Sequence, residues 1–426
     1  PLGPTAGAGM GLVPATALGV GGMMGAGLYT LLGLAAQSAG TWLPLAFAVG
    51  AVAAVFSVYS YAKLGAVFPS RGGAAEFINE GFGRTTLAGG LNVFQYIAYL
   101  IAAALYAAGF SEYVSALIGD GFPEVAKRVV AVAVVAVFTL VNLIGAKVVG
   151  KSESVIIIVE LFIIAAFVVT ASWHAVPDRI ASDPGSVVGV VTAAAILYVT
   201  YQGFGVVTNA AGSMDQPRRD LPRAMFGALA IVTAVYLVVS TLVVMVLPLT
   251  TIKADAGHVL ADAGRVIMGS AGFVIIAIAA LLATASAVNA TLFAASNVSA
   301  NVAKNQQISE FLGHTVWRDG TVALLVSGVT VAVLVVFFPL SVVGQMASLA
   351  FLVVYAAVSI GHLHIRNKTG AKAWPLIGAI AINSVLFVML LVNSARTSAG
   401  SVIFMVVAFA GSFVFEAGYR RHRGLT

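Results

Sequence analysis

Apolar residues in this chain are grouped in runs of about 20, which short polar, proline or glycine segments separate. An α-helix rises about 1.5 Å per residue, so a run of that length crosses a hydrocarbon layer of about 30 Å. The pattern predicts an integral membrane protein with about twelve spanning helices and little room for a soluble domain. The predicted spans cover residues 12–36, 42–68, 86–112, 126–146, 154–173, 187–212, 223–248, 266–302, 320–338, 341–363, 374–393 and 397–418.

The composition supports an all-α membrane fold. Of the 426 residues, 60% are hydrophobic and 9% are charged, against about 25% charged in soluble domains. The chain has no cysteine, which excludes disulfides and thiolate metal sites. We expect the lipid bilayer as its surroundings, no metal site and no nucleic-acid partner.

Basic residues concentrate in alternate predicted connections. With a cytoplasmic N-terminus, the cytoplasmic connections and the tail hold fifteen of them: Arg71, Arg84, Lys147, Lys151, Arg218, Arg219, Arg223, Lys304, Arg318, Arg366, Lys368, Lys372, Arg420, Arg421 and Arg423. The other side holds six: Lys127, Arg128, Arg179, Lys253, Arg265 and Arg396. Positive residues favour the cytoplasmic face, so we predict a multi-pass protein of the cytoplasmic (inner) membrane with both termini in the cytoplasm.

The first and sixth predicted spans are unusually rich in glycine at mid-membrane. The first holds five glycines between residues 19 and 27, and the sixth has Gly203 and Gly205 among polar side chains. We predict that both helices are unwound there, because irregular backbone is tolerated in a bilayer where it lines a cavity. The alternative is that the glycines are packing notches between helices.

Unwound spans at corresponding positions of two halves predict an inverted repeat. Helices 1–5 would form one repeat over residues 10–173, and helices 6–10 the second over residues 187–365. Helices 11 and 12, over residues 372–420, would lie outside this five-plus-five arrangement.

Four segments of the sequence resemble the amino acid–polyamine–organocation (APC) superfamily of permeases. They are residues 25–29 with Gly33, residues 68–73, residues 142–145, and residues 201–205 with the following 216–224. The likeness runs in order from about residue 10 to residue 420. It implies a leucine-transporter-like fold and a transporter, not an enzyme.

The resemblance implies secondary active transport of a small amino acid by alternating access, with proton coupling. The driving force would be a transmembrane proton or Na⁺ gradient, with no bound cofactor. The alternative is an APC-superfamily carrier of another small solute or cation, such as a polyamine, K⁺ or a Na⁺-coupled substrate.

A zwitterionic amino acid fits two unwound helices. Free N–H groups at the start of the second half of helix 1 would attract its carboxylate, and free carbonyl groups over residues 199–203 would attract its ammonium group. The predicted substrate-binding residues are Met23, Met24, Gly25, Ala26, Gly27, Tyr198, Val199, Tyr201, Gln202, Gly203 and Phe204.

This sequence differs from many members of the family at Gly205, where they carry Glu. Glycine at this position removes a carboxylate that could hold the substrate, and it enlarges the expected substrate cavity. Tyr198, Tyr201 and Phe204, with Tyr29 on helix 1, are aromatic candidates for a gate over the substrate.

Two ionisable residues, Lys63 and Glu160, lie well inside predicted spans. Such residues usually face a cavity or a partner. Lys63 is near enough to the membrane surface for its long side chain to reach water. Glu160 lies deeper in its span, and its side chain is too short to reach the surface. Burial disfavours a charged carboxylate, so we predict that Glu160 exchanges protons and takes part in coupling.

Many family members carry Lys at the position of Glu160, where it replaces a sodium ion between helices 1, 5 and 8. The sequence leaves two other roles open for the carboxylate. It would ligate Na⁺ with helix-8 donors such as Thr284, Ser286 and Asn289, or it would pair with Lys63.

Overall fold

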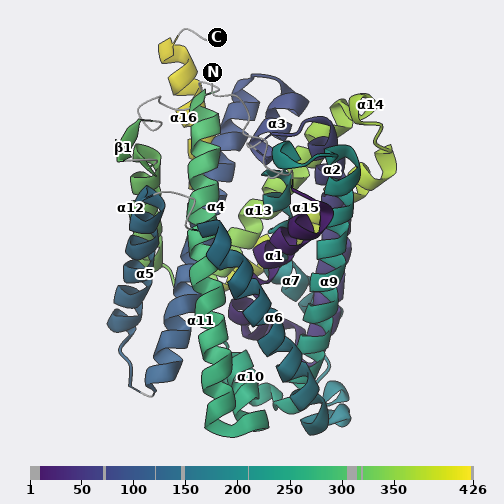
Figure 1. The fold of residues 1–426 in the computed structure, drawn as a ribbon, viewed down its shortest axis with the longest axis vertical. Helices are drawn as coiled ribbons and strands as arrows, with labels where there is room; N and C mark the ends of the chain where they lie inside the picture. The colour runs from purple at the N-terminus through teal and green to yellow at the C-terminus, as the bar shows by residue number, and fades with distance from the viewer. Residues whose placement is uncertain are drawn as a thin grey trace.

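The computed structural model describes residues 10–70, 73–119, 121–144, 149–209, 211–304, 314–317 and 320–423, which form a bundle of long helices (Figure 1). The helical elements are α1 (Leu12–Ala39), α2 (Leu43–Val67), α3 (Ala74–Phe82), α4 (Thr86–Ile118), α5 (Glu124–Ile144), α6 (Val149–His174), η1 (Pro177–Ala181), α7 (Val187–Leu197), η2 (Tyr198–Tyr201), α8 (Phe204–Asn209), η3 (Ala211–Ser213), α9 (Pro217–Val246), α10 (Leu249–Ala254), α11 (Val259–Lys304), α12 (Val322–Phe337), α13 (Leu340–His364), α14 (Arg366–Thr369), α15 (Ala373–Thr397) and α16 (Ala399–Arg423). A short hairpin, β1 (Thr315–Trp317) with β2 (Gly320–Thr321), precedes α12.

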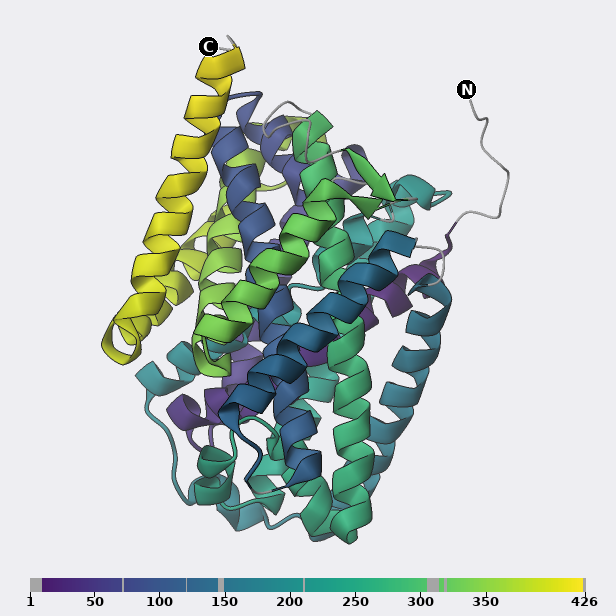
Figure 2. The ribbon, with the colours of Figure 1, turned by 90° about the vertical axis from the view of Figure 1, so that its left-hand side faces the viewer.

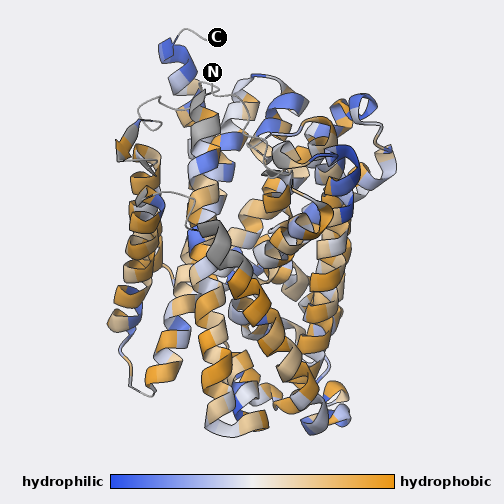
Figure 3. Ribbon diagram, in the orientation of Figure 1, coloured by the Kyte–Doolittle hydropathy of each residue, from blue (hydrophilic) through white to orange (hydrophobic). Residues whose placement is uncertain are grey.

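Each predicted span falls on a helix of the structure, with α7, η2 and α8 together forming the sixth. Among the described residues, nine helices are long and apolar enough to cross a membrane, and α1 is the tenth when its two bent halves count as one span. The remaining two spans fall on α5 and on the shorter apolar helix α12, which lie together at one flank of the bundle (Figure 1). Hydrophobic residues cover the length of the bundle, and hydrophilic residues gather toward its ends (Figure 3). The predicted all-α membrane fold is confirmed.

The eighth predicted span, residues 266–302, falls on α11, which has a kink at Met268 and Gly269 close to the predicted start. Gly269 has a φ of 67°, a conformation that glycine adopts without strain. The kink separates a short helix from the long apolar one, and the two pack against each other there, because a Cβ atom added to Gly264 would lie 2.8 Å from the carbonyl oxygen of Gly272.

The described parts of both chain ends lie at the same end of the bundle, which we call the terminal side (Figures 1 and 2). Helices α3 and α14 also lie there, while α10 lies at the opposite side (Figure 1).

Helices distant in sequence pack in pairs. Helix α1 packs against α7 and α8, α2 against α9, α4 against α11, and α5 against α12. Helix α6 contacts α1, α9 and α11. The two glycine-rich spans, α1 and α7–η2–α8, therefore meet inside the bundle.

Candidate functional site

The first and sixth spans are interrupted in different ways. Helix α1 keeps its helical assignment throughout but bends by 42° between the segments Leu12–Met24 and Gly27–Ala39. The predicted unwinding of α1 is thus replaced by a bend. In the sixth span α7 ends at Leu197, η2 forms a 3₁₀ turn, and α8 begins at Phe204.

The two interruptions touch through their backbones. A Cβ atom added to Gly203 would overlap the carbonyl group of Gly22, and one added to Gly27 would lie 2.5 Å from Cβ of Thr200. Only glycine lets the two chains approach so closely at these positions. The glycines singled out in the sequence thus act as points of contact between α1 and η2.

Side chains from other helices satisfy the backbone groups that the interruptions free. The hydroxyl of Tyr236 on α9 donates to the carbonyl oxygen of Met23 at 2.6 Å and to that of Thr200 at 3.3 Å. The hydroxyl of Tyr355 on α13 donates to the carbonyl oxygen of Gln202 at 3.1 Å. Unsatisfied backbone groups are costly inside a membrane, so these tyrosines stabilise the interrupted conformation.

Ser348 on α13 serves the N-terminal side of the second interruption. Its hydroxyl donates to the carbonyl oxygen of Ile196 at 2.6 Å and accepts from the N–H of Val199 at 3.3 Å. Sequence reasoning missed Ser348, Tyr236 and Tyr355. The available signal was a hydroxyl in the middle of an otherwise apolar span.

The predicted substrate-binding residues with described side chains are buried around these interruptions. Met23 and Met24 are each 1% exposed, and Gln202 contacts the hydroxyl of Tyr106 on α4 at 3.3 Å. The backbone of Gly25 and Ala26 is helical, but the side chain of Ala26 is outside the described part. The structure thus brings both predicted halves of the site together.

The tyrosines of η2 direct their hydroxyl groups toward α2. The Tyr198 hydroxyl lies 2.7 Å from Oγ of Ser57, and the Tyr201 hydroxyl donates to the carbonyl oxygen of Phe47 at 2.9 Å. Phe204 packs against Tyr355 with 5.1 Å between ring centroids. These contacts anchor the interrupted span, and a gating role for the rings stays a prediction.

Gly205 differs from its neighbour Gly203. A Cβ atom added at Gly205 would meet no heavy atom within 4 Å. The missing side chain therefore leaves open space beside Phe204, and an enlarged substrate cavity stays a prediction.

Glu160 lies on the inward face of α6. Its side chain is 3% exposed, whereas Val155, Ile158 and Phe162 of the same helix are exposed on the outer face. Its ionisable neighbours are Tyr29 on α1 and Tyr236 on α9. The Tyr29 hydroxyl interacts with the Glu160 carboxyl group, although within the described residues neither Oε1 of Glu160 nor the Tyr29 hydroxyl has a partner at full hydrogen-bond geometry.

The helix-8 donors lie on α11 and are already engaged in part. The Thr284 hydroxyl donates to the carbonyl oxygen of Ala280 at 2.7 Å, and Asn289 accepts a hydrogen bond from Asn142 at 2.7 Å. Ser286 is half-buried. Across the described ranges, no group of three or more His, Cys, Asp or Glu side chains is arranged for a metal ion.

Lys63 lies apart from Glu160. It lines a pocket at the terminal side with Arg218 and Lys368. No ion pair between described residues joins Lys63 to Glu160. The structure therefore does not support the ion pair that the sequence left open as an alternative.

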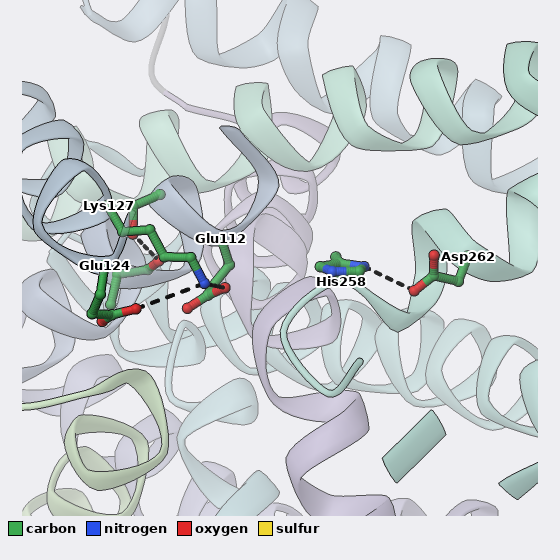
Figure 4. Close-up of polar contacts among 7 residues, drawn as sticks. Glu112, Glu124, Lys127, His258 and Asp262 are labelled. Atoms are coloured by element: carbon green, nitrogen blue, oxygen red, sulfur yellow. Dashed lines mark hydrogen bonds and ion pairs between the residues drawn. The ribbon is translucent and has the colours of Figure 1, made fainter. Parts of the chain in front are cut away.

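A second polar pocket, of about 470 Å³, lies at the opposite side, and Figure 4 shows some of the residues in and beside it. Nζ of Lys127 lies 2.9 Å from Oε2 of Glu112, and Nδ1 of His258 lies 2.8 Å from Oδ2 of Asp262. Sequence reasoning did not single out this pocket, because its charges come from loops and helix ends far apart in the chain.

A helical bundle with two glycine-rich interrupted spans packed against each other is typical of membrane transporters. The chain matches the family model for amino acid permeases over residues 10–414, and it belongs to the amino acid permease family. The predicted resemblance to APC permeases is confirmed, and the protein is a transporter, not an enzyme.

Relatives of this chain cover nearly its whole length. It is 31% identical over 414 residues to an uncharacterized protein of Methanocaldococcus jannaschii, covering 97% of this chain and 95% of that protein. It is 30% identical over 367 residues to the inner membrane transport protein YbaT of Escherichia coli, covering 85% of each. It is 25% identical over 446 residues to the branched-chain amino acid permease BcaP of Bacillus subtilis, covering 98% of this chain and 94% of that protein.

Proposed function

We propose that this permease moves a small zwitterionic amino acid across the cytoplasmic membrane by proton-coupled alternating access. Both chain termini would lie in the cytoplasm, as the distribution of basic residues favours. The names of YbaT and BcaP support transport at an inner membrane and an amino-acid substrate, respectively.

The substrate would bind between the bend of α1 and the interruption of the sixth span. Its carboxylate would lie at the bend of α1, near Gly25 and Gly27. There the bend would open into a break, whose free N–H groups and helix dipole favour an anion. Its ammonium group would lie near the carbonyl groups of η2. Tyr236 and Tyr355 already donate to two of the nearby carbonyl oxygens, and each carbonyl oxygen retains a second lone pair.

The packing of the helices supports a five-plus-five inverted repeat. In span order, helices 1 to 4 pack against helices 6 to 9, so each contacts the helix five places later. Alternating access would then consist of one group of helices rocking against another around the interrupted pair.

The single observation that carries the coupling proposal is the burial of Glu160. A buried carboxyl group near the bend of α1, with Tyr29 as its polar neighbour and no cation paired with it among the described residues, is poorly stabilised as an anion in an apolar interior. It would take a proton when the site opens to one side and release it when the site opens to the other. Glu160 would be protonated and uncharged while the transporter changes its access with the substrate bound.

The test is uptake into proteoliposomes under an imposed pH gradient. Glu160→Gln should abolish proton-driven accumulation while leaving exchange of labelled substrate across the membrane measurable, because glutamine keeps the shape but does not titrate. The matched control is Glu416→Gln on α16. Glu416 is the other buried carboxyl group in the described chain, and its partner is Arg420 at 3.6 Å.

Accumulation by the Glu160→Gln variant with the pH dependence of the wild type would refute the coupling role. Accumulation that follows a Na⁺ gradient and ignores the pH gradient would replace the proton with Na⁺ held by Glu160 and α11.

The open space at Gly205 favours a second candidate, a carrier of a larger or cationic solute such as a polyamine. Thermal stabilisation by a panel of the twenty amino acids and several amines separates the two, because a ligand that binds only the folded protein raises its melting temperature. Stabilisation by amines alone would replace the amino-acid proposal.

A further inference from the structure

A pocket at the terminal side concentrates positive charge outside the candidate transport site. It has a volume of about 470 Å³ and lies between α2, α9 and α14. Lys63 comes from α2, Arg218 from the first turn of α9, and Lys368 from α14. Segments distant in the sequence thus bring three cations to one cavity.

No described residue neutralises these cations. Among the described residues, no carboxylate lines the pocket, and none of the three cations makes an ion pair. The polar pocket at the opposite side differs, because there Lys127 is paired with Glu112 at 2.9 Å and Arg265 lies 3.9 Å from the ring centroid of Phe273. The terminal-side pocket therefore lacks a negative charge that an anionic ligand would supply.

The apolar part of the pocket leads to the outer face of the bundle. Pro222 and Phe226 follow Arg218 at intervals of four residues, so the three residues share one face of α9. Phe226 is exposed. Val52 and Val55 of α2 are also exposed, and they lie on the helix face that continues to the pocket residue Tyr59. A ligand here would meet cations at the polar end and apolar side chains along the membrane-facing surface.

We propose that this pocket binds the phosphate group of an anionic membrane phospholipid, with the acyl chains lying along the outer face of α2 and α9. Basic pockets between helices at the cytoplasmic side of membrane proteins suit such head groups. The phosphate would contact Lys63, Arg218 and Lys368. A phosphate ester also occurs in soluble metabolites, but the apolar surface that continues from the pocket favours the lipid.

A bound lipid would add a connection between three elements, two of which, α2 and α14, are already linked at this end through hydrogen bonds of His362 to Ser60 and to Thr369. Because it would bind the folded protein and not the unfolded chain, it should raise the melting temperature with its concentration.

The experiment is thermal unfolding of the delipidated protein in a nonionic detergent. The added probes are phosphatidylglycerol, phosphatidylcholine with the same acyl chains, and glycerol 3-phosphate without chains. We expect saturable stabilisation by phosphatidylglycerol, and little by the other two. Lys63→Gln, Arg218→Gln and Lys368→Gln should each weaken the apparent affinity for phosphatidylglycerol by about fivefold, the typical effect of one basic residue near an anionic surface.

The matched controls are Arg223→Gln and Arg366→Gln, which remove exposed charges at the same end without altering the pocket lining. Equal weakening by these controls would show attraction by surface charge in general and overturn the pocket. Equal stabilisation by phosphatidylcholine, or unchanged affinity in the pocket variants, would also overturn it. Tight binding of glycerol 3-phosphate would replace the lipid with a soluble phosphate.

The exposed Arg218 and Lys368 carry the test if Lys63→Gln does not fold. The readout requires no transport activity, so it is independent of the substrate and coupling ion proposed above.

Discussion

The two interrupted spans reach the same place in the bundle by different means. Helix α1 bends by 42° and retains helical backbone, whereas the sixth span passes through a 3₁₀ turn and begins a new helix at Phe204. Among the described contacts, the bend receives a donor from Tyr236, while the second interruption is held by Tyr236, Tyr355 and Ser348. The larger break frees more backbone groups, and the protein supplies more side chains to satisfy them.

The contact between the two interruptions should be the most sensitive point. Gly203→Ala should destabilise the protein by about 3 kcal/mol, because the added Cβ would overlap the backbone of Gly22 and force the two spans apart. Thermal unfolding in detergent and substrate binding measure the effect.

Gly205→Ala is the matched control two residues away. Open space surrounds its Cβ position, so the change in stability should be within about 1 kcal/mol, and in the stabilising direction because alanine favours helices. Equal losses from both substitutions would mean that the effect comes from backbone flexibility and not from the contact with α1.

Tyr236 and Tyr355 should contribute unequally to stability. Tyr236→Phe removes a donor shared by Met23 and Thr200, and should cost roughly 1–2 kcal/mol. Tyr355→Phe removes one bond to Gln202 and should cost about 0.6 kcal/mol, the typical value between membrane helices. Melting temperatures rank the two variants.

Loss of transport should follow the same order, since Tyr236 contacts both interruptions. A Tyr355→Phe variant that is the less stable or less active of the two would contradict the view that the shared donor matters most.

The smallest effect concerns a connection between α1 and the second polar pocket, at the side opposite the terminal side. The hydroxyl of Tyr113 donates to the carbonyl oxygen of Tyr29 at 3.0 Å, and Tyr113 lies near Asp262, the partner of His258. The charge state of His258 should therefore affect the second half of α1.

Burial alone lowers the pKa of His258. The hydrogen bond to Asp262 and the nearby carboxylates of Asp262, Asp255 and Glu112 together raise it by more, so the pKa lies above its ordinary value. The cations Lys127 and Arg265 also line this pocket. Protonated His258 then stabilises the fold fully below about pH 6.5, the unfolded value, and this contribution is lost as the pH rises through the raised folded pKa.

His258→Gln should be less stable than the wild type near pH 6 by less than about 1 kcal/mol. The difference should shrink by about pH 8.5, because neutral histidine no longer has the extra stabilisation. Melting temperatures of both proteins across this range provide the measurement. A difference that grows with pH would show the opposite sign of linkage.

The sequence predicted the spans well because the bilayer imposes a minimum length of apolar helix. It also located the second interruption, since Gly203 and Gly205 stand among polar residues in an apolar run. It overestimated the break in α1, where glycines make close contacts while the helix continues.

The direction in which each side chain points was harder to predict. Glu160 and Lys63 both looked like charges inside a membrane, yet one is buried against α1 and the other lines a pocket at the terminal side. Which helix supplies a partner depends on packing between distant segments. For that reason Tyr236 and Ser348 could not be assigned to the interruptions from sequence alone.

The hydroxyl of Tyr236, shared by two carbonyl groups, bears on how α1 and η2 would move apart. It has a single proton and donates more closely to Met23, at 2.6 Å, than to Thr200, at 3.3 Å. In the proposed alternating access, separation of α1 and η2 would break one of these two bonds, and the freed carbonyl group would need water or substrate as its new partner. We therefore expect separation of the two spans to be linked to hydration of the site.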